Sequence, residues 1–271
     1  MSISLTDKAI IITGASSGIG AATALACASA GMPVLLNGRH EVRLENVAKQ
    51  IRSLGQRAEI VVGDVTDSNF SEQLLDTAEH SFDGFYAVFA NAGIGLDQPL
   101  NSMSTEEIRR HFEINFFSSV DLNIQAAKRL IADNKSGHLI TNSSCLAKFT
   151  IPGHGAYSAA KSAQNHFSRA MGMELKSHNI YVSSVLPITT ATSFFSTAAT
   201  KRGLDGPQHM LPTHTPKIFI QKPERVARAI VKCLRSPRPE VWTSFTVRLT
   251  AAMFTLSPRL ADFILSRSGT R

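Results

Sequence analysis

The stretch AIIITGASSGIG, residues 9–20, decides the fold. A short apolar run leads directly into a turn with three glycines, Gly14, Gly18 and Gly20, and then into a run of helix-forming alanines. Glycines in such a strand-to-helix turn let the backbone approach a pyrophosphate, and they leave the amides of the helix N-terminus open to anionic oxygens. The spacing is G-x-x-x-G-x-G rather than the common G-x-G-x-x-G. We therefore expect a dinucleotide here, with a purely structural turn as the weaker alternative. The residues expected to meet it are Gly14, Ser16, Ser17, Gly18, Ile19 and Gly20.

Along the rest of the chain, short apolar runs alternate with longer segments of helical periodicity. This alternation is typical of repeated βαβ units, which build a parallel sheet covered by helices. Strands are expected at 9–12, 34–36, 59–62, 86–90, 138–141, 181–186 and 240–243, and helices at 18–30, 42–54, 70–80, 105–133, 156–176 and 223–235. The sequence thus predicts an α/β protein with a Rossmann-like, doubly wound parallel sheet of about seven strands.

No repeat or linker divides the chain, so we expect one catalytic domain over residues 1–244, followed by a C-terminal amphipathic helical extension over 245–271. Residues 188–222 interrupt the alternation and have no clear period, and loops of that length are often lids or binding loops. We expect this loop to close over a substrate pocket, although packing of its apolar residues onto their own domain is at least as favourable. Those apolar residues are Phe194, Phe195, Met210, Leu211 and Phe219.

Composition and charge limit the classes of function. Lys and Arg number 28 against 21 Asp and Glu, which gives a net charge of +7 and a pI of about 9.5. This excess favours anionic ligands, partners or surfaces, but no dense basic run with interleaved aromatics is present, so we expect no nucleic acid. Cys27, Cys145 and Cys233 lack paired spacing, which argues against disulfides and a metal site and suits a reducing compartment. We read no signal peptide or membrane-spanning stretch and expect a cytoplasmic protein.

The end of the second expected strand bears on which dinucleotide binds. NAD sites place an acid there to hold the ribose 2′-hydroxyl, whereas NADP sites offer a cation to the 2′-phosphate. Residues 34–40 read VLLNGRH, so Gly38 stands where the acid is expected and Arg39 follows. An arginine can bind a phosphate with two hydrogen bonds, and His40 can assist it. The sequence therefore predicts NADP(H), with a solvated arginine at a strand end as the alternative.

Several short motifs follow one another in a familiar order. They are TGASSGIG (13–20), GDV (63–65), NAG (91–93), Asn115 in EINFFSS, Ser144 in NSSCLAK, and YSAAK (157–161). With them, the chain resembles the short-chain dehydrogenase/reductase family. The resemblance implies a catalytic tetrad of Asn115, Ser144, Tyr157 and Lys161; Ser143 is the alternative to Ser144, which the family's usual spacing to the tyrosine favours. It also implies nucleotide contacts by Asp64, Val65, Asn91, Ala92 and Gly93, besides Tyr157 and Lys161 themselves.

Tyr157 and Lys161 stand one helical turn apart among small residues, and taken alone they fit an ordinary surface pair. Carbonyl reduction needs a hydride and a proton, and a tyrosine can donate the proton. Moving a tyrosine pKa from about 10 towards 7 takes roughly 4 kcal/mol. A cation at about 5 Å in a dielectric near 20 supplies roughly 3 kcal/mol. We therefore expect Lys161 to lower the pKa of Tyr157. The resemblance further implies that Ser144 orients the carbonyl oxygen, and that Asn115 kinks its helix and anchors a proton-relaying water.

The segment after the sixth expected strand departs from the family pattern. Family members usually have Pro-Gly there and a threonine that meets the nicotinamide carboxamide, whereas this chain reads LPITTAT. Pro187 and Thr192 match the pattern, and we expect both to contact the cofactor. Ile188 replaces the glycine and cannot readily take a positive φ. Either the turn has a different backbone, or this position needs no left-handed conformation.

The C-terminus resembles the hydroxysteroid, retinol and lipid-type branches of the family. We accordingly expect an NADPH-dependent oxidoreductase that interconverts a carbonyl and a secondary alcohol on a small apolar substrate. The alternatives are a 3-oxoacyl-[acyl-carrier-protein] reductase and a non-catalytic NADP(H)-sensing scaffold. The family habit predicts a homodimer or homotetramer. The tail 245–271 either packs in a core or subunit interface, which is the commoner case, or makes a peripheral membrane contact.

Overall fold

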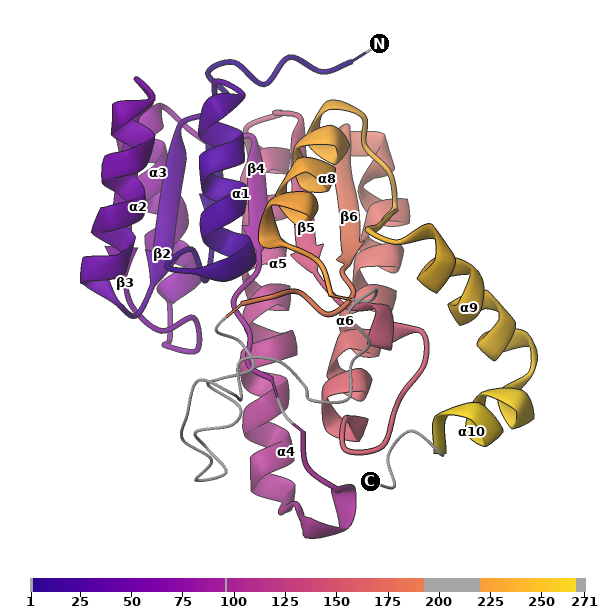
Figure 1. The fold of residues 1–271 in the computed structure, drawn as a ribbon. Helices are drawn as coiled ribbons and strands as arrows, with labels where there is room; N and C mark the ends of the chain where they lie inside the picture. Colours follow the sequence, from indigo (N-terminus) through magenta and orange to yellow (C-terminus); the bar gives the residue numbers. More distant parts are fainter. Residues whose placement is uncertain (1, 96, 193–219, 267–271) are drawn as a thin grey trace.

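A parallel sheet forms the centre of the computed structural model, which describes residues 2–95, 97–192 and 220–266 (Figure 1). The strands are β1 (Ile10–Ile12), β2 (Val34–Gly38), β3 (Ala58–Val62), β4 (Ala87–Ala90), β5 (Gly137–Asn142), β6 (Ile180–Leu186) and β7 (Glu240–Trp242). They lie side by side in the order β3-β2-β1-β4-β5-β6-β7, and every pairing is parallel. The strand order reverses between β1 and β4, and ligands of such sheets bind at the carboxyl ends of the strands at this point.

Helices cover both faces of the sheet (Figure 1). The long helices are α1 (Gly18–Ser29), α2 (Glu41–Ser53), α3 (Phe70–Phe82), α5 (Ser118–Ala132), α6 (Gly155–Glu174) and α8 (Pro223–Arg235). One core cluster joins the sheet to α1, α2 and α8, and a second joins its other face to α3, α5 and α6. Both faces of the strands are therefore buried, which is why their sequences are almost continuously apolar. The doubly wound α/β fold predicted from the sequence is confirmed.

The expected helix over residues 105–133 is interrupted. It consists of α4 (Thr105–Phe112), one π-helical turn (Glu113–Phe117) and α5. Ser104 begins α4 with a capping box, because its hydroxyl accepts from the Glu107 amide while the Glu107 carboxylate accepts from the Ser104 amide. The π turn contains Asn115, whose side chain bonds to a neighbouring loop. A single extra residue in the turn thus re-aims the asparagine.

Short 3₁₀ turns and two terminal helices complete the description. The 3₁₀ turns are Leu100–Ser102, Cys145–Ala147 and Leu175–His178, and the terminal helices are α9 (Phe245–Leu256) and α10 (Pro258–Ser266). α9 and α10 extend along one side of the molecule, away from the sheet (Figure 1). Pro258 marks the break between them, since proline is tolerated in the first turn of a helix but not in its interior. No helix among the described residues is long and apolar enough to cross a membrane.

Candidate active site

The glycine turn connects β1 to α1 at the carboxyl edge of the sheet. Gly14 and Gly18 have φ values of +64° and +57°, in the left-handed region that favours glycine. A Cβ at Gly14 would lie 3.0 Å from the Cα of Ala92, and a Cβ at Gly18 would lie 2.9 Å from the Cγ2 of Thr192. Gly20 lies against the Gly14 carbonyl, so that the turn can close onto the helix. The turn thus brings the predicted nucleotide residues Ala92 and Thr192 against the glycines.

The NAG segment is tied to this turn by hydrogen bonds. The Thr13 hydroxyl accepts from the amides of Asn91 and Ala92, each at 3.0 Å. The Asn91 side-chain amide donates to the carbonyl oxygens of Thr13 and Gly14, at 2.9 and 3.2 Å. Its side-chain oxygen accepts from Nδ2 of Asn142 at the end of β5. The carboxyl ends of β1, β4 and β5 are therefore held in one hydrogen-bonded unit.

The residues predicted to select the nucleotide lie at the ends of β2 and β3. Arg39 and His40 are exposed directly after β2, and a Cβ at Gly38 would lie 3.4 Å from the side chain of Ser16. The Arg39 guanidinium lies 3.5 Å from the Asp64 carboxylate. Burial raises the pKa of Asp64, but hydrogen bonds from Thr66 and the charge of Arg39 outweigh it, and the pKa falls below its usual value. A cation thus stands at the expected place, paired to the predicted adenine residue.

Asn115 connects the π turn to the NAG segment. Its Oδ1 accepts from the Ile94 amide and its Nδ2 donates to the Ile94 carbonyl, both at 3.1 Å. These two bonds fix which end of the side-chain amide is oxygen. Nδ2 also lies 3.1 Å from Nε2 of the buried His111, whose ring meets Tyr157 edge-on at a centroid distance of 6.0 Å. A Cβ at Gly93 would lie 2.6 Å from Oδ1 of Asn115, so this glycine leaves the space that Asn115 occupies.

Ser144, Tyr157 and Lys161 come together where β5 ends and α6 begins. The Ser144 hydroxyl is hydrogen-bonded to the Tyr157 phenol and also accepts from the Leu146 amide at 3.1 Å. The Lys161 ammonium lies 5.8 Å from the centre of the Tyr157 ring. Ser143, the alternative to Ser144, instead donates to the Lys161 carbonyl at 3.1 Å. The geometry therefore favours Ser144 as the serine of the site.

Lys161 is 3% exposed and is held by two acceptors. Its ammonium donates to the Asn142 carbonyl at 2.7 Å and to Oε1 of Gln164 at 3.1 Å. Gln164 is also buried, and its Nε2 donates to the Ser119 hydroxyl at 2.9 Å. A chain of polar contacts thus runs from α5 through α6 to the end of β5, and it fixes the position of the ammonium.

Burial dominates the titration of the tyrosine and the lysine. It raises the pKa of the Tyr157 phenol above its ordinary value, although the hydrogen bond with Ser144 acts in the opposite direction. It lowers the pKa of Lys161 to about 7. In the protein alone, burial therefore outweighs any lowering of the Tyr157 pKa by Lys161, because both groups lose hydration and each favours its neutral form.

The segment after β6 resolves the question raised by Ile188. Its φ is not positive, and the residue is buried; its amide lies 3.4 Å from the Thr243 hydroxyl. Since the position needs no left-handed conformation, isoleucine is tolerated there. Thr190 and Gln221 form a parallel β-bridge that closes the base of the loop. Most of the expected substrate loop, with Phe194, Phe195, Met210, Leu211 and Phe219, lies outside the described residues.

Comparison with known proteins identifies the family. Residues 8–203 match the family model of the short chain dehydrogenases. The chain belongs to this family.

An uncharacterized oxidoreductase of Mycobacterium tuberculosis is 30% identical over 249 residues, covering 92% of this chain and 93% of the relative. A 3-oxoacyl-[acyl-carrier-protein] reductase of Synechocystis is 33% identical over 189 residues, 69% of this chain and 76% of the relative. The structure of an alcohol dehydrogenase from Thermococcus sibiricus, complexed with 5-hydroxy-NADP, has a TM-score of 0.73 and 26% identity, and covers 87% of this chain and 95% of its own. The protein is thus an oxidoreductase of the short-chain dehydrogenase family.

Three residues at the site of this short-chain dehydrogenase were not anticipated from its sequence: Thr13, His111 and Gln164. Thr13 directly precedes the glycine turn, His111 stands one helical turn before Asn115, and Gln164 stands one turn after Lys161. Helical spacing of three or four residues from a candidate residue is a signal that could have found the last two. Within the described residues, no group of three His, Cys, Asp or Glu side chains could hold a metal ion.

Proposed function

We propose that this short-chain dehydrogenase is NADP(H)-dependent and interconverts a carbonyl and a secondary alcohol on an apolar substrate. The observation that carries the proposal is the hydrogen bond between the Ser144 hydroxyl and the Tyr157 phenol beside the buried Lys161 ammonium. These groups lie where β5 and α6 meet, next to the glycine turn that would hold the nucleotide. When bound, the cofactor supplies the hydride. The chain must then bind and orient the carbonyl and provide the proton.

Each group has a distinct task in this scheme. Tyr157 holds the proton on its phenol oxygen and donates it to the substrate oxygen as that oxygen gains negative charge. The raised pKa of Tyr157 keeps the phenol protonated at neutral pH, as reduction requires. Ser144 donates a hydrogen bond to the substrate oxygen and so orients the carbonyl. Lys161 stabilises the phenolate that remains, and Asn115 holds the NAG segment in register with the site.

The glycine turn fits a nucleotide. Positive φ at Gly14 and Gly18 and the close approach of Ala92 leave no room for side chains where a pyrophosphate would lie. Arg39 supports the choice of NADP(H), because its guanidinium is exposed at the end of β2, where a 2′-phosphate would lie. Its contact with Asp64 is long, so the guanidinium can serve a phosphate as well. The 5-hydroxy-NADP bound by the Thermococcus sibiricus relative supports the same choice.

The cofactor preference is tested by thermal unfolding with NADPH, with NADH and without either. A nucleotide at one hundred times its dissociation constant stabilises a protein by about 2.7 kcal/mol. We expect a larger shift with NADPH, and we expect Arg39→Gln to remove the difference. Lys49→Gln, an exposed cation on α2, is the matched control and should keep it. A larger shift with NADH in the unchanged protein would refute the preference for NADP(H).

The reaction is tested separately with an NADPH-linked screen of apolar ketones. Tyr157→Phe should lose turnover by at least about a hundredfold, since positioned acid–base groups contribute that much, while NADPH still stabilises the fold. Normal turnover in this variant would reject the proposed chemistry. If no substrate is turned over although NADPH binds, the alternative of an NADP(H)-sensing scaffold gains support.

A second candidate substrate class is a 3-oxoacyl chain on a carrier protein, which is favoured by the likeness to the Synechocystis reductase. The same site would reduce such a ketone by the same steps. Acetoacetyl thioesters compared with bulky free ketones, at equal concentrations, separate the two classes. A higher kcat/KM for the free ketone supports the apolar substrate.

A further inference from the structure

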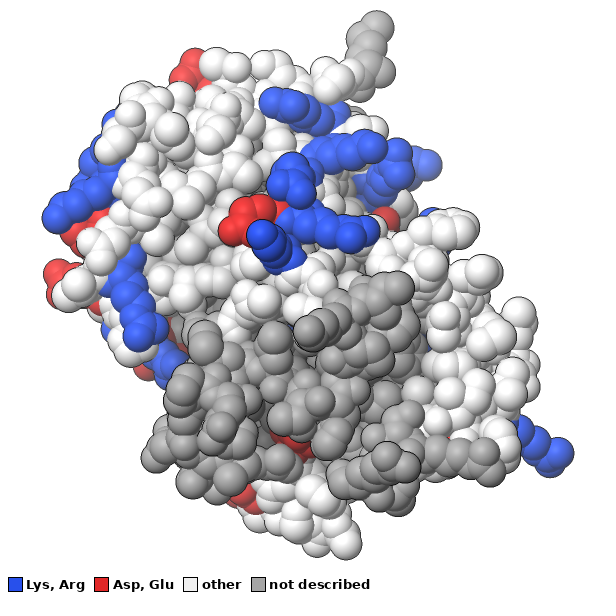
Figure 2. Space-filling view, in the orientation of Figure 1, with Lys and Arg blue, Asp and Glu red and all other residues white. Residues whose placement is uncertain are grey.

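The helix α8 carries a row of cations on its exposed face. The row consists of Arg225, Arg228, Lys232 and Arg235, at intervals of three and four residues that place them on one side of the helix. All four are exposed, and among residues 2–95, 97–192 and 220–266 none of them takes part in an ion pair. Figure 2 shows Lys and Arg gathered over α8. A surface hollow of about 590 Å³ beside α1 is lined in part by three of these cations. The row is thus free to meet an anionic partner.

α9 and α10 expose a second kind of surface. On α9 the large apolar side chains that face solvent are Phe245, Leu249, Met253 and Leu256, which are 76%, 64%, 42% and 87% exposed. On α10 they are Leu260, Phe263 and Ile264, which are 40%, 57% and 41% exposed. The opposite side of α9 is already packed onto the body through Val247, Ala251 and Phe254. α9 is therefore apolar on both sides, and packing onto its own domain explains one of them. Seven large apolar side chains on two consecutive helices indicate an interaction surface.

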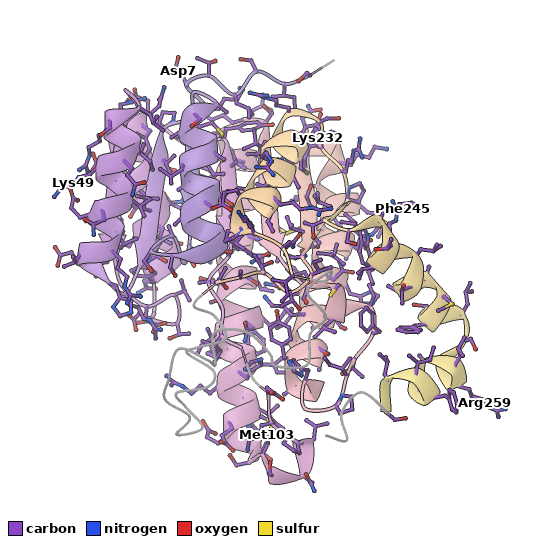
Figure 3. The ribbon with its side chains drawn as sticks, in the orientation of Figure 1. Asp7, Lys49, Met103, Lys232, Phe245 and Arg259 are labelled. Atoms are coloured by element: carbon purple, nitrogen blue, oxygen red, sulfur yellow. The ribbon has the colours of Figure 1, made fainter. Side chains whose placement is uncertain are left out.

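The basic row and the apolar helices lie near one another on the molecule. Figure 2 shows the basic residues over α8 and a largely uncharged surface over α9 and α10 on the same face. In Figure 3, Lys232, Phe245 and Arg259 follow one another down the right-hand side of the view. The charged residues of α9 and α10 are Arg248, Arg259 and Asp262, so these helices are also slightly basic.

We propose that α8, α9 and α10 form a membrane-binding face that docks on an anionic lipid bilayer. The exposed apolar side chains would enter the boundary between headgroups and acyl chains, and the basic row would meet the anionic headgroups. A second copy of this chain is a poorer occupant, because it would bring two basic rows together. An acidic carrier protein would match the basic row but would leave the apolar residues exposed to water. The proposal does not depend on which substrate the enzyme converts.

The direct test is flotation of the full chain with vesicles of phosphatidylcholine alone or with a fraction of phosphatidylserine. We expect binding to the anionic vesicles and little to the neutral ones, and weaker binding as the salt concentration rises. The double variant Arg228→Gln, Lys232→Gln should bind the anionic vesicles about 25-fold less, since each cation contributes about fivefold. Arg52→Gln with Arg57→Gln, on and after α2, is the matched control and should bind normally.

The apolar part of the face is tested with Leu256→Glu, at the most exposed of the seven positions. Loss of leucine burial and the added charge should reduce vesicle binding by at least about tenfold. Val42→Glu introduces the same charge at a position on α2 that is 76% exposed, and it should bind like the unchanged chain. Thermal unfolding in the presence of NADPH checks that each variant is folded. Leu249→Glu serves as a second variant if Leu256→Glu does not fold.

Three results would overturn the proposal. The first is absence of binding to anionic vesicles at low salt. The second is vesicle binding that Leu256→Glu and Leu249→Glu leave unchanged. Such a result would show that the apolar side chains do not enter the bilayer. The third is a change of oligomeric state in Leu256→Glu, measured by light scattering without lipid, which would assign the apolar residues to a contact between copies of the chain. Each readout is independent of turnover.

Discussion

Lys161 shows how strongly burial alters a single residue. An exposed lysine has a pKa near 10.4, whereas this one, enclosed between α6 and β5, has a pKa of about 7. Its two acceptors, the Asn142 carbonyl and Gln164, compensate part of the lost hydration. A lysine that titrates near neutrality can change its charge during a catalytic cycle.

This shift predicts a pH dependence of stability. Between about pH 7 and pH 10 the unfolded chain binds a proton at Lys161 that the folded chain does not, so the free energy of unfolding should rise with pH in this window. Lys161→Met removes that contribution. The melting temperature of the variant relative to the unchanged chain should therefore fall as pH is raised from 7 to 10, as followed by circular dichroism. Lys49→Met, at an exposed lysine, should show no such trend.

His111 acts on the site through Asn115, and we predict a positioning role for it. His111→Phe keeps a ring next to Tyr157 but removes the nitrogen that faces the Asn115 amide. One lost hydrogen bond corresponds to about a tenfold effect, so kcat should fall about tenfold while the KM for NADPH stays nearly constant. His111→Gln, which can still accept a hydrogen bond, should recover part of the loss. If His111→Phe and His111→Gln lowered kcat by the same factor and thermal stability by the same amount, His111 would serve only the packing of the site. His166→Phe, at an exposed position on α6, is the control.

At the scale of elements, the loop after β4 and the π turn depend on each other. Asn115 holds the NAG segment through both polar groups of the Ile94 backbone, and Gly93 provides the space for it. An uninterrupted α-helix over residues 105–133 would direct Asn115 differently. The irregular turn is therefore the element that brings the asparagine to the site.

Gly93→Ala tests this dependence. The added Cβ would lie 2.6 Å from Oδ1 of Asn115, so either the loop or the π turn must shift. We expect the affinity for NADPH and the turnover each to fall at least about tenfold, because small displacements of positioning groups have effects of that size or larger. Gly172→Ala is the matched control: it lies within α6, its Cβ would make ordinary contact with Val182 at 3.4 Å, and it should stabilise the fold by up to about 1 kcal/mol. Unchanged NADPH binding in Gly93→Ala would contradict the dependence.

At the scale of the whole molecule, α9 connects the C-terminal region to the site. The rings of Phe254 on α9 and Phe149 meet edge-on at a centroid distance of 5.6 Å. Phe149 follows the 3₁₀ turn Cys145–Ala147, which directly succeeds Ser144. α9 is thus packed against the segment that carries the serine of the site. A deletion of residues 245–271 would remove this contact and expose Phe149.

Phe254→Ala measures the strength of this connection. Phe254 is 6% exposed, and removing a buried phenylalanine typically costs about 3–5 kcal/mol of unfolding free energy. We expect a loss of that order in urea unfolding, together with reduced turnover. Phe263→Ala on α10, at a position that is 57% exposed, should change stability by less than about 0.5 kcal/mol. A stability loss below about 1 kcal/mol in Phe254→Ala would indicate that α9 is only loosely attached.

The sequence by itself determined the order of strands and helices, the glycine turn and the family. These features depend on local patterns: apolar runs mark the buried strands, and glycines mark the turn that needs positive φ at Gly14 and Gly18. The spacing of Tyr157 and Lys161 along one helix makes them neighbours without any long-range contact. Their catalytic roles rest on the family resemblance and stay predictions. The division at residue 244, the oligomeric state and the choice of nucleotide stay predictions.

Only the tertiary structure decided what surrounds these residues. The π turn, the contacts of His111 and Gln164, and the direction of the pKa shifts of Tyr157 and Lys161 all depend on segments that are distant in sequence. The electrostatic argument from sequence assumed a charged lysine in a partly polar medium, whereas burial removes water from both groups. Desolvation depends on every neighbour that excludes water, and a local pattern of residues does not contain that information.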